Sequence, residues 1–284
     1  MNHNITASAL LAAGVMLALG GCKGESPEHK AAAALDAQVD SLIAAGQYRQ
    51  AVVIIDSLNR TYPKEIEIRK GTNLKRSKAF EGLATTQIPV LEARIDSLRQ
   101  AIDAMEPDFK IMKPSAALPG YGVYKTAAGT DFMAAPTVQA RVNTDIHDAA
   151  DTPWTLSVNA GRNIGLQSVS VSLSNGGTYD MKVVSADGQT GTVSPEAATP
   201  LAEAITDGAT ATVTAMGSNG KAVFKLSSAQ LTAIAQSCRF AGDKAALRAA
   251  LIDRERVDRM LQIARDQSAN AATAPDAAGA DAAK

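Results

Sequence analysis

The stretch that decides the fold is LQSVSVSLS, residues 166–174, in which apolar and polar side chains alternate. A period of two is the period of a β-strand, because successive side chains of a strand point to opposite faces of the sheet. Val169, Val171 and Leu173 form the predicted core face, and the opposite face carries Leu166 and three serines. The stretch therefore predicts a half-buried strand.

Similar stretches lie on both sides of it, between Gly120 and Leu226. They are short, rich in Val and Thr, and alternating: TVQARVNTDI (137–146), WTLSVNA (154–160), TYDMKVVSA (178–186), ATATVTAMG (209–217) and KAVFKL (221–226). Glycine, asparagine and aspartate separate them, at 161–163, 175–177, 187–188 and 219–220. Because these residue types close hairpins, the sequence predicts about six or seven antiparallel strands. Residues 120–226 are thus expected to form a β-sandwich-like domain.

Ahead of this domain, apolar residues recur at the three- and four-residue steps of amphipathic helices, over residues 31–106. Two stripes flank Gly46 and predict a helical hairpin: Leu35, Val39, Leu42 and Ile43, then Tyr48, Val52, Ile55 and Leu58. The segment GQYRQA (46–51) and the later Tyr62-Pro63 resemble the second half of a tetratricopeptide repeat. No second copy follows at that repeat's period, so a single hairpin is expected and not a solenoid.

A further stripe, Ile88 to Met105, alternates steps of three and four as a heptad seam does. Because it spans less than about three heptads, we expect it to pack on another helix of the same chain, with a dimer as the alternative. Pro89 either caps a new helix or kinks a long one. Three prolines then lie between Glu106 and Gly120 and predict a linker at residues 107–119.

The helical period returns in residues 227–267. Ser227 or Ser228 is a suitable N-cap for one helix, and Asp243 for a second whose stripe runs from Leu247 to Ala264 through Leu251, Val257 and Leu261. Since this stripe and the Ile88–Met105 seam both need a partner, we expect them to pack together. Residues 268–284 carry no aliphatic side chain larger than alanine and are predicted to be disordered. The predicted fold class is α+β, with the C-terminal helix on the N-terminal helices.

The sequence before the helices has the pattern of an export signal. Residues 7–19 form an apolar run that matches a signal-peptide core and is shorter than the ~20 residues of a membrane-spanning helix. The segment LALGGC (17–22) at its end resembles the lipobox of bacterial lipoproteins. The resemblance implies a signal peptide at residues 1–21, cleavage after Gly21, and attachment of acyl chains such as palmitate to Cys22. The alternative is a structural cysteine behind an ordinary secretory leader.

The lipoprotein resemblance also implies a location. Two or three acyl chains hold a protein on a membrane leaflet almost permanently. Residues 22–30 are polar and contain a proline, which predicts a flexible tether. Lys23 replaces the aspartate that marks inner-membrane retention in many species, so the resemblance favours the outer membrane. The whole order of segments resembles envelope lipoproteins in which a helical hairpin precedes a β domain, a resemblance that implies no activity.

Few residues suggest catalysis. The chain has 28 basic and 29 acidic residues, and nothing in this balance suggests a nucleic-acid-binding surface or a polybasic membrane patch. If Cys22 is acylated, Cys238 has no disulfide partner, and its apolar neighbours favour a buried thiol over a reactive one. His147 lies among three aspartates, but neither the motif of a serine hydrolase nor that of an EF-hand accompanies it. The sequence therefore predicts no catalytic residue, metal or cofactor.

Two kinds of function remain. The first is a membrane-tethered, non-enzymatic scaffold or protein-interaction module whose partners are other envelope proteins. The second is a glycan- or peptidoglycan-binding β module, which would stack sugars on exposed aromatic rings. Trp154, Tyr121 and Tyr124 are the candidates for such a face. Whether these rings point outward discriminates between the two functions.

Overall fold

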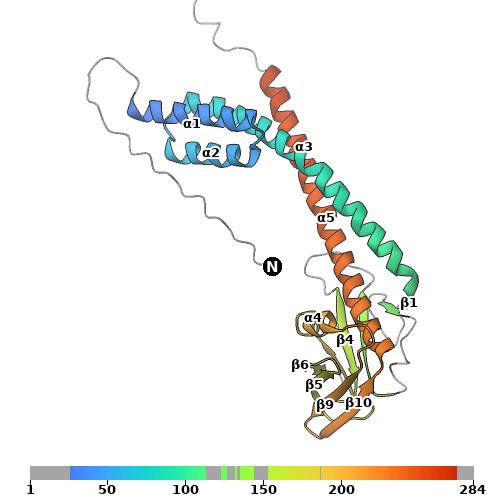
Figure 1. The fold of residues 1–284 in the computed structure, drawn as a ribbon. Helices are drawn as coiled ribbons and strands as arrows, with labels where there is room; N and C mark the ends of the chain where they lie inside the picture. The colour runs from blue at the N-terminus through green and yellow to red at the C-terminus, as the bar shows by residue number, and fades with distance from the viewer. Residues whose placement is uncertain are drawn as a thin grey trace, which may run out of the picture. The chain divides into compact units, whose positions relative to one another are not determined.

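A computed structural model describes residues 26–112, 123–126, 132, 135–143, 153–185 and 187–273. These residues form helices and two antiparallel sheets, which confirms the α+β fold class (Figure 1). They divide into two compact units. The smaller unit combines the residues up to Gly82 with those from Ala264 onward, and the larger unit is Leu83–Ile263. Two long helices, α3 (Ile66–Met105) and α5 (Ser228–Thr273), contribute to both units.

In the smaller unit, α1 (Pro27–Ala44) and α2 (Tyr48–Thr61) form the predicted hairpin. Gly46 takes a φ of 71° in the turn, a conformation that favours glycine. The hairpin core consists of Val39 from α1, Ala51 and Ile55 from α2, and Ala79 from α3. This packing confirms the two apolar stripes on either side of Gly46.

Helix α1 begins earlier than the sequence predicts. It starts at Pro27, so residues 27–30 of the expected tether are helical. The reason is local: proline suits the first turn of a helix, and the Ser26 hydroxyl accepts a hydrogen bond from the His29 N–H at 3.0 Å. These two features stabilise the start of α1 at Pro27, which the polar composition of residues 22–30 does not predict.

Charged side chains tie α1 to α3. Lys75 Nζ lies 2.9 Å from Asp36 Oδ2 and 2.6 Å from Asp40 Oδ2. The hydroxyl of Thr72 donates to Asp36 Oδ1 at 2.7 Å. Burial tends to lower the pKa of Lys75, but the hydrogen bonds and charges of the two aspartates outweigh it, and the pKa is raised. Lys75 therefore stays protonated and holds the two helices together.

Helix α3 continues without interruption past Pro89, so of the two alternatives Pro89 lies inside one long helix. The predicted seam is buried at Ile95 and Ile102, which are 5% and 7% exposed. Helix α5 packs antiparallel on α3, as expected, with Arg254 Nη2 3.0 Å from Glu92 Oε1 in the larger unit. In the smaller unit Arg265 Nε lies 3.5 Å from Glu81 Oε1. The seam is thus covered by a helix of the same chain.

The larger unit holds both sheets, in which all paired strands are antiparallel. The six-stranded sheet has the order β1-β2-β3-β4-β8-β7, made of β1 (Phe109–Met112), β2 (Val123–Thr126), β3 (Thr137–Asn143), β4 (Trp154–Asn159), β8 (Thr190–Val193) and β7 (Val184–Ser185). The four-stranded sheet has the order β10-β9-β5-β6, made of β10 (Gly220–Leu226), β9 (Ala211–Gly217), β5 (Leu166–Leu173) and β6 (Thr178–Lys182).

One core joins the two sheets to α4 (Pro195–Ala204) and to the first part of α5. Val158 from one sheet and Val171 from the other are fully buried, as are Leu201 of α4 and Phe240 of α5. The ring of Phe240 stacks on that of Phe109, with centroids 4.3 Å apart. The larger unit is therefore a two-sheet sandwich with helices packed against the same core.

Strand β5 confirms the predicted core face and adds one feature to it. Val169, Val171 and Leu173 are 1%, 0% and 6% exposed. Leu166 is also buried, at 2%, although simple alternation places it with the serines. The pairing of β5 with β9 shifts register between Leu166 and Ser168, and such a bulge turns the first side chain back to the core.

Several boundaries differ from the expectation. The turn at 161–163 joins β4 to β5, which lie in different sheets, so it is not a hairpin. The turns at 175–177, 187–188 and 218–219 do close hairpins. The predicted linker at 107–119 contains β1, whose apolar Phe109 pairs into the sheet. Strand β8 and helix α4 were not expected, because the first is short and the second contains two prolines.

Helix α5 is one helix where the sequence predicts two. Ser227 and Gln230 form a capping box: the Ser227 N–H donates to Gln230 Oε1 at 2.9 Å, and the Gln230 N–H donates to Ser227 Oγ at 3.3 Å. Asp243 lies inside the helix and caps nothing. The helix also continues through residues 268–273 of the predicted disordered tail, since alanine favours helix even without an apolar stripe.

Candidate functional site

Of the residues that the sequence singles out, the structure describes Trp154 and Cys238 with their side chains. Gly21, Cys22, Tyr121 and His147 lie outside the described residues. Tyr124 lies in β2, paired with Ile111 of β1 and Val142 of β3, and its side chain is outside the described part.

Trp154 belongs to the core of the larger unit. It begins β4, opposite Val142 of β3, and is 3% exposed. A tryptophan on the inner face of a sandwich has no ring face available to a sugar in solution. The aromatic face expected for a glycan-binding module is therefore not formed around Trp154.

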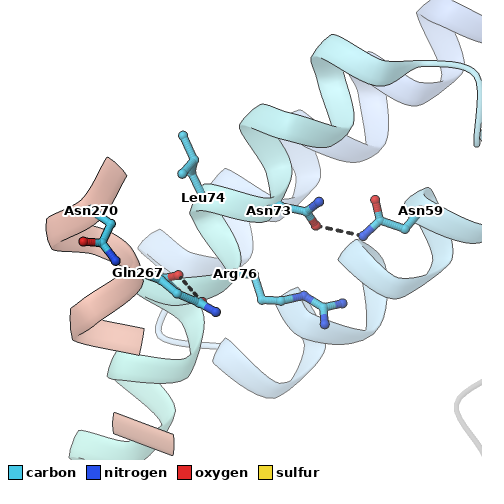
Figure 2. Close-up of a pocket in the computed structure, with 7 residues that line it drawn as sticks. Asn59, Asn73, Leu74, Arg76, Gln267 and Asn270 are labelled. Atoms are coloured by element: carbon cyan, nitrogen blue, oxygen red, sulfur yellow. Dashed lines mark hydrogen bonds between the residues drawn. The ribbon is translucent and has the colours of Figure 1, made fainter. Parts of the chain in front are cut away.

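A polar cleft in the smaller unit is a stronger candidate, and we call it the amide cleft. It has a volume of about 480 Å³ and is formed by α2, α3 and α5. Three asparagines and a glutamine line it with one arginine, one serine and one leucine: Asn59, Asn73, Asn270, Gln267, Arg76, Ser77 and Leu74 (Figure 2). Carboxamides thus dominate its wall, and each can donate and accept hydrogen bonds.

The direction of two of these amides is fixed by Arg69. A guanidinium can only donate, and Arg69 Nε donates to Asn59 Oδ1 at 3.1 Å. Asn59 must therefore present its Nδ2 to Asn73, and it donates to Asn73 Oδ1 at 2.9 Å, as the dashed line in Figure 2 marks. Arg69 is held in turn by the carbonyl of Pro63, which accepts from Nη1 at 2.7 Å. The chain of bonds leaves Asn73 Nδ2 without a partner among the described residues.

The opposite wall of the amide cleft comes from α5. Ser77 Oγ donates to Gln267 Oε1 at 3.0 Å, and Gln267 Nε2 has no partner among the described residues. Ser77 is 2% exposed, whereas Gln267 is exposed. The side-chain nitrogens of Asn73 and Gln267 are thus both N–H donors without a partner among the described residues.

The amide cleft carries no excess charge. Arg76 forms an ion pair with Asp56, and its guanidinium lies 5.9 Å from the ring centroid of Phe80. No carboxylate is found among the described residues that line the cleft. Leu74 adds an apolar side chain that is 55% exposed. The arrangement suits hydrogen bonding to a neutral ligand.

A second hollow lies in the larger unit, around Cys238. It has a volume of about 590 Å³, and α4, α5 and the start of β4 line it. Cys238 is half-buried, and burial raises the pKa of its thiol. A hydrogen bond with Thr199 opposes this shift, while the charge of Glu203 adds to it. The thiol is therefore protonated at neutral pH and a weak nucleophile, as the apolar sequence around it suggests.

The sequence does not single out the lining residues of the amide cleft. Polar residues on a helix ordinarily face solvent, and Gln267 and Asn270 of α5 are about 190 residues from the lining residues of α2 and α3. One weak signal exists: Asn73 lies inside a helix, where asparagine is a poor helix former.

No protein-family model matches the chain, and neither does any curated protein or solved structure. Within the described residues, no group of three or more His, Cys, Asp or Glu side chains is placed to hold a metal ion. No helix in that part of the chain is long and apolar enough to cross a membrane.

Proposed function

We propose that the protein is a lipid-anchored envelope protein that works as a non-enzymatic protein-interaction module. The amide cleft carries the proposal, because three helices form its wall and two of them, α3 and α5, present hydrogen-bond donors without a partner among the described residues. Rigid elements position binding groups better than loops do. The partner is another envelope protein, held at the membrane surface where the anchor keeps this chain.

The sequence supports the anchor. LALGGC ends an apolar segment of signal-peptide length, and Cys22 is its cysteine. Acylation there places the protein on a membrane leaflet, with the outer membrane favoured by Lys23. The tether to the helices is then short, since α1 begins at Pro27.

The groups in the amide cleft favour binding over chemistry. Asparagine, glutamine, serine and leucine side chains neither exchange protons near neutral pH nor attack a substrate unaided. Arg76 forms an ion pair with Asp56 through Nη2, while its buried Nε has no hydrogen-bond partner among the described residues. Such groups hold a ligand by hydrogen bonds and contact area.

A protein partner fits this cleft better than a glycan does. Sugar sites combine polar groups with an aromatic ring on which the pyranose stacks. No aromatic side chain is among the described residues that line the amide cleft, and Trp154 is buried elsewhere. The amide cleft therefore offers a glycan no ring among its described residues, and Trp154, which borders the hollow around Cys238, is only 3% exposed.

Site-specific photo-cross-linking in living cells tests the proposal. A photoreactive amino acid replaces Leu74, which is 55% exposed in the amide cleft. The matched control replaces Val184, which is 73% exposed but lies in β7 of the larger unit. We expect adducts with a defined envelope protein from position 74 and not from position 184. Adducts from neither position, or equally from both, would contradict the proposed function.

A further inference from the structure

We infer that the amide cleft binds the main chain of an extended peptide segment by donating hydrogen bonds to its carbonyl oxygens. The inference rests on the proposed function and names the chemistry of the ligand. Its starting point is the set of amide groups: the oxygens of Asn59, Asn73 and Gln267 each already accept one hydrogen bond, whereas Asn73 Nδ2 and Gln267 Nε2 donate none to a described residue.

The cleft therefore has more unfilled donor capacity than acceptor capacity, since each of these amide oxygens keeps one lone pair while the donor groups keep several hydrogens, including the buried Nε of Arg76. Asn73 Nδ2 on α3 and Gln267 Nε2 on α5 each have hydrogens to donate and no partner among the described residues. Donors on two facing helices need acceptors on the ligand. The complementary ligand must present at least two oxygen acceptors.

Charge excludes most anionic ligands from this role. The one cation in the wall, Arg76, is already paired with Asp56. A ligand carboxylate would have to displace Asp56 or remain beside it, and like charges close together are destabilising. A carbonyl oxygen accepts the same hydrogen bonds without a charge.

The main chain of an extended peptide supplies such carbonyls. In helices and paired strands the carbonyls are already bonded, so a folded partner surface offers few of them. An extended segment exposes one carbonyl per residue and places successive ones on opposite sides. Leu74 can contact an apolar side chain of the same segment, which adds affinity without demanding a particular sequence.

The test uses the full chain and a defined probe. The probe is an array of hexapeptides with randomised positions, each acetylated at the N-terminus and amidated at the C-terminus so that no terminal carboxylate is present. The strongest binder is then resynthesised with one central carbonyl reduced to a methylene. We expect the parent peptide to bind and the reduced peptide to bind at least about tenfold more weakly, since a lost hydrogen bond plus a stranded donor is of that order.

Two isosteric variants report on the protein side. Asn73→Asp keeps the acceptor that Asn59 uses and turns the unused N–H into a carboxylate oxygen, and Gln267→Glu does the same on α5. Both should weaken peptide binding at least about tenfold. Asn219→Asp, in the β9–β10 turn, adds the same charge away from the cleft and should change nothing. Circular dichroism verifies that each variant is folded. Because Gln267 is exposed, Gln267→Glu should fold even if Asn73→Asp does not, and it then tests the inference alone.

Three results would overturn the inference. The first is that no capped peptide binds. The second is peptide binding that Asn73→Asp and Gln267→Glu leave unchanged. The third is binding of N-acetylglucosamine oligosaccharides, sensitive to both variants, in place of peptides. If Leu74 cross-links to an envelope protein but the peptides fail, the peptide inference fails alone; if the cross-links also fail, so does the proposed function.

Discussion

Burial controls the chemistry of Cys238, the thiol in the hollow between α4 and α5. Its pKa is raised from the ordinary value of 9.0, first by burial, because a thiolate is poorly solvated there. We expect native Cys238 to react more slowly with iodoacetamide at pH 8 than it does in the urea-unfolded chain. Mass spectrometry of a Cys22→Ala variant measures this without interference from a second thiol. Equal rates in the two states would contradict the burial argument.

The same shift has a consequence for stability. The folded state holds the thiol proton more tightly than the unfolded state does, so the contribution of the thiol is fully present below the unfolded pKa. It is lost as the pH rises through the raised folded pKa. A Cys238→Ala variant removes this dependence, so its unfolding free energy should fall less than that of the parent above pH 9.

At the scale of elements, two glycines of α3 make a matched pair. A Cβ at Gly71 would meet nothing within 4 Å, whereas a Cβ at Gly82 would overlap the ring of Tyr48 on α2. Alanine is the better helix former by about 1 kcal/mol. Gly71→Ala should therefore raise the unfolding free energy by up to about 1 kcal/mol, and Gly82→Ala should lower it. Urea unfolding followed by circular dichroism measures both, and equal stabilisation would refute close packing of Tyr48 on α3.

The seam between α3 and α5 gives a second prediction at this scale. Ile95 is 5% exposed within the larger unit, and Val90 on the same helix is 68% exposed. Ile95→Ala should lower the unfolding free energy by about 2 kcal/mol or more, because it leaves a cavity. Val90→Ala should change it by less than about 0.5 kcal/mol. Thermal melting of the two variants provides the comparison, and similar melting temperatures would mean that α5 does not cover the seam.

Strong local patterns predicted most elements of this fold. Period-two alternation found β5 and β9, and the three- and four-residue steps found the helical hairpin and the seam. Two elements were not predicted, because their sequence patterns are short or mixed. Strand β8 has only four residues, and helix α4 contains Pro195 and Pro200. The break expected at Asp243 did not form, because packing of one continuous α5 outweighs the roughly 1 kcal/mol cost of Gly242 inside a helix.

The amide cleft could not be predicted in the same way. Which N–H groups are available as donors depends on which atoms of each carboxamide already form hydrogen bonds. Contacts such as that of Arg69 with Asn59 decide this. Periodicity describes which face of a helix is apolar, but it carries no information on how polar side chains of separate helices meet.

For the whole molecule, the anchor gives the prediction with the largest effect. A Cys22→Ala variant has no thiol to acylate, so it should lose all label from radioactive palmitate and leave the outer-membrane fraction. Metabolic labelling followed by membrane fractionation measures both. A Cys238→Ala variant is the control and should keep label and location. Equal labelling of the two variants would contradict the lipoprotein proposal.

The smaller unit consists of residues that precede the larger unit in the sequence and residues that follow it. Its two parts are therefore synthesised at different times. A ribosome makes α1 and α2 early, but Gln267 and Asn270 emerge only after every strand of the two sheets has been made. The hairpin core of Val39, Ala51, Ile55 and Ala79 needs no residue of α5, but the amide cleft is incomplete until Gln267 and Asn270 are present. A chain released early could fold the sheets and still lack the amide cleft, so ligand binding there would distinguish finished molecules from truncated ones.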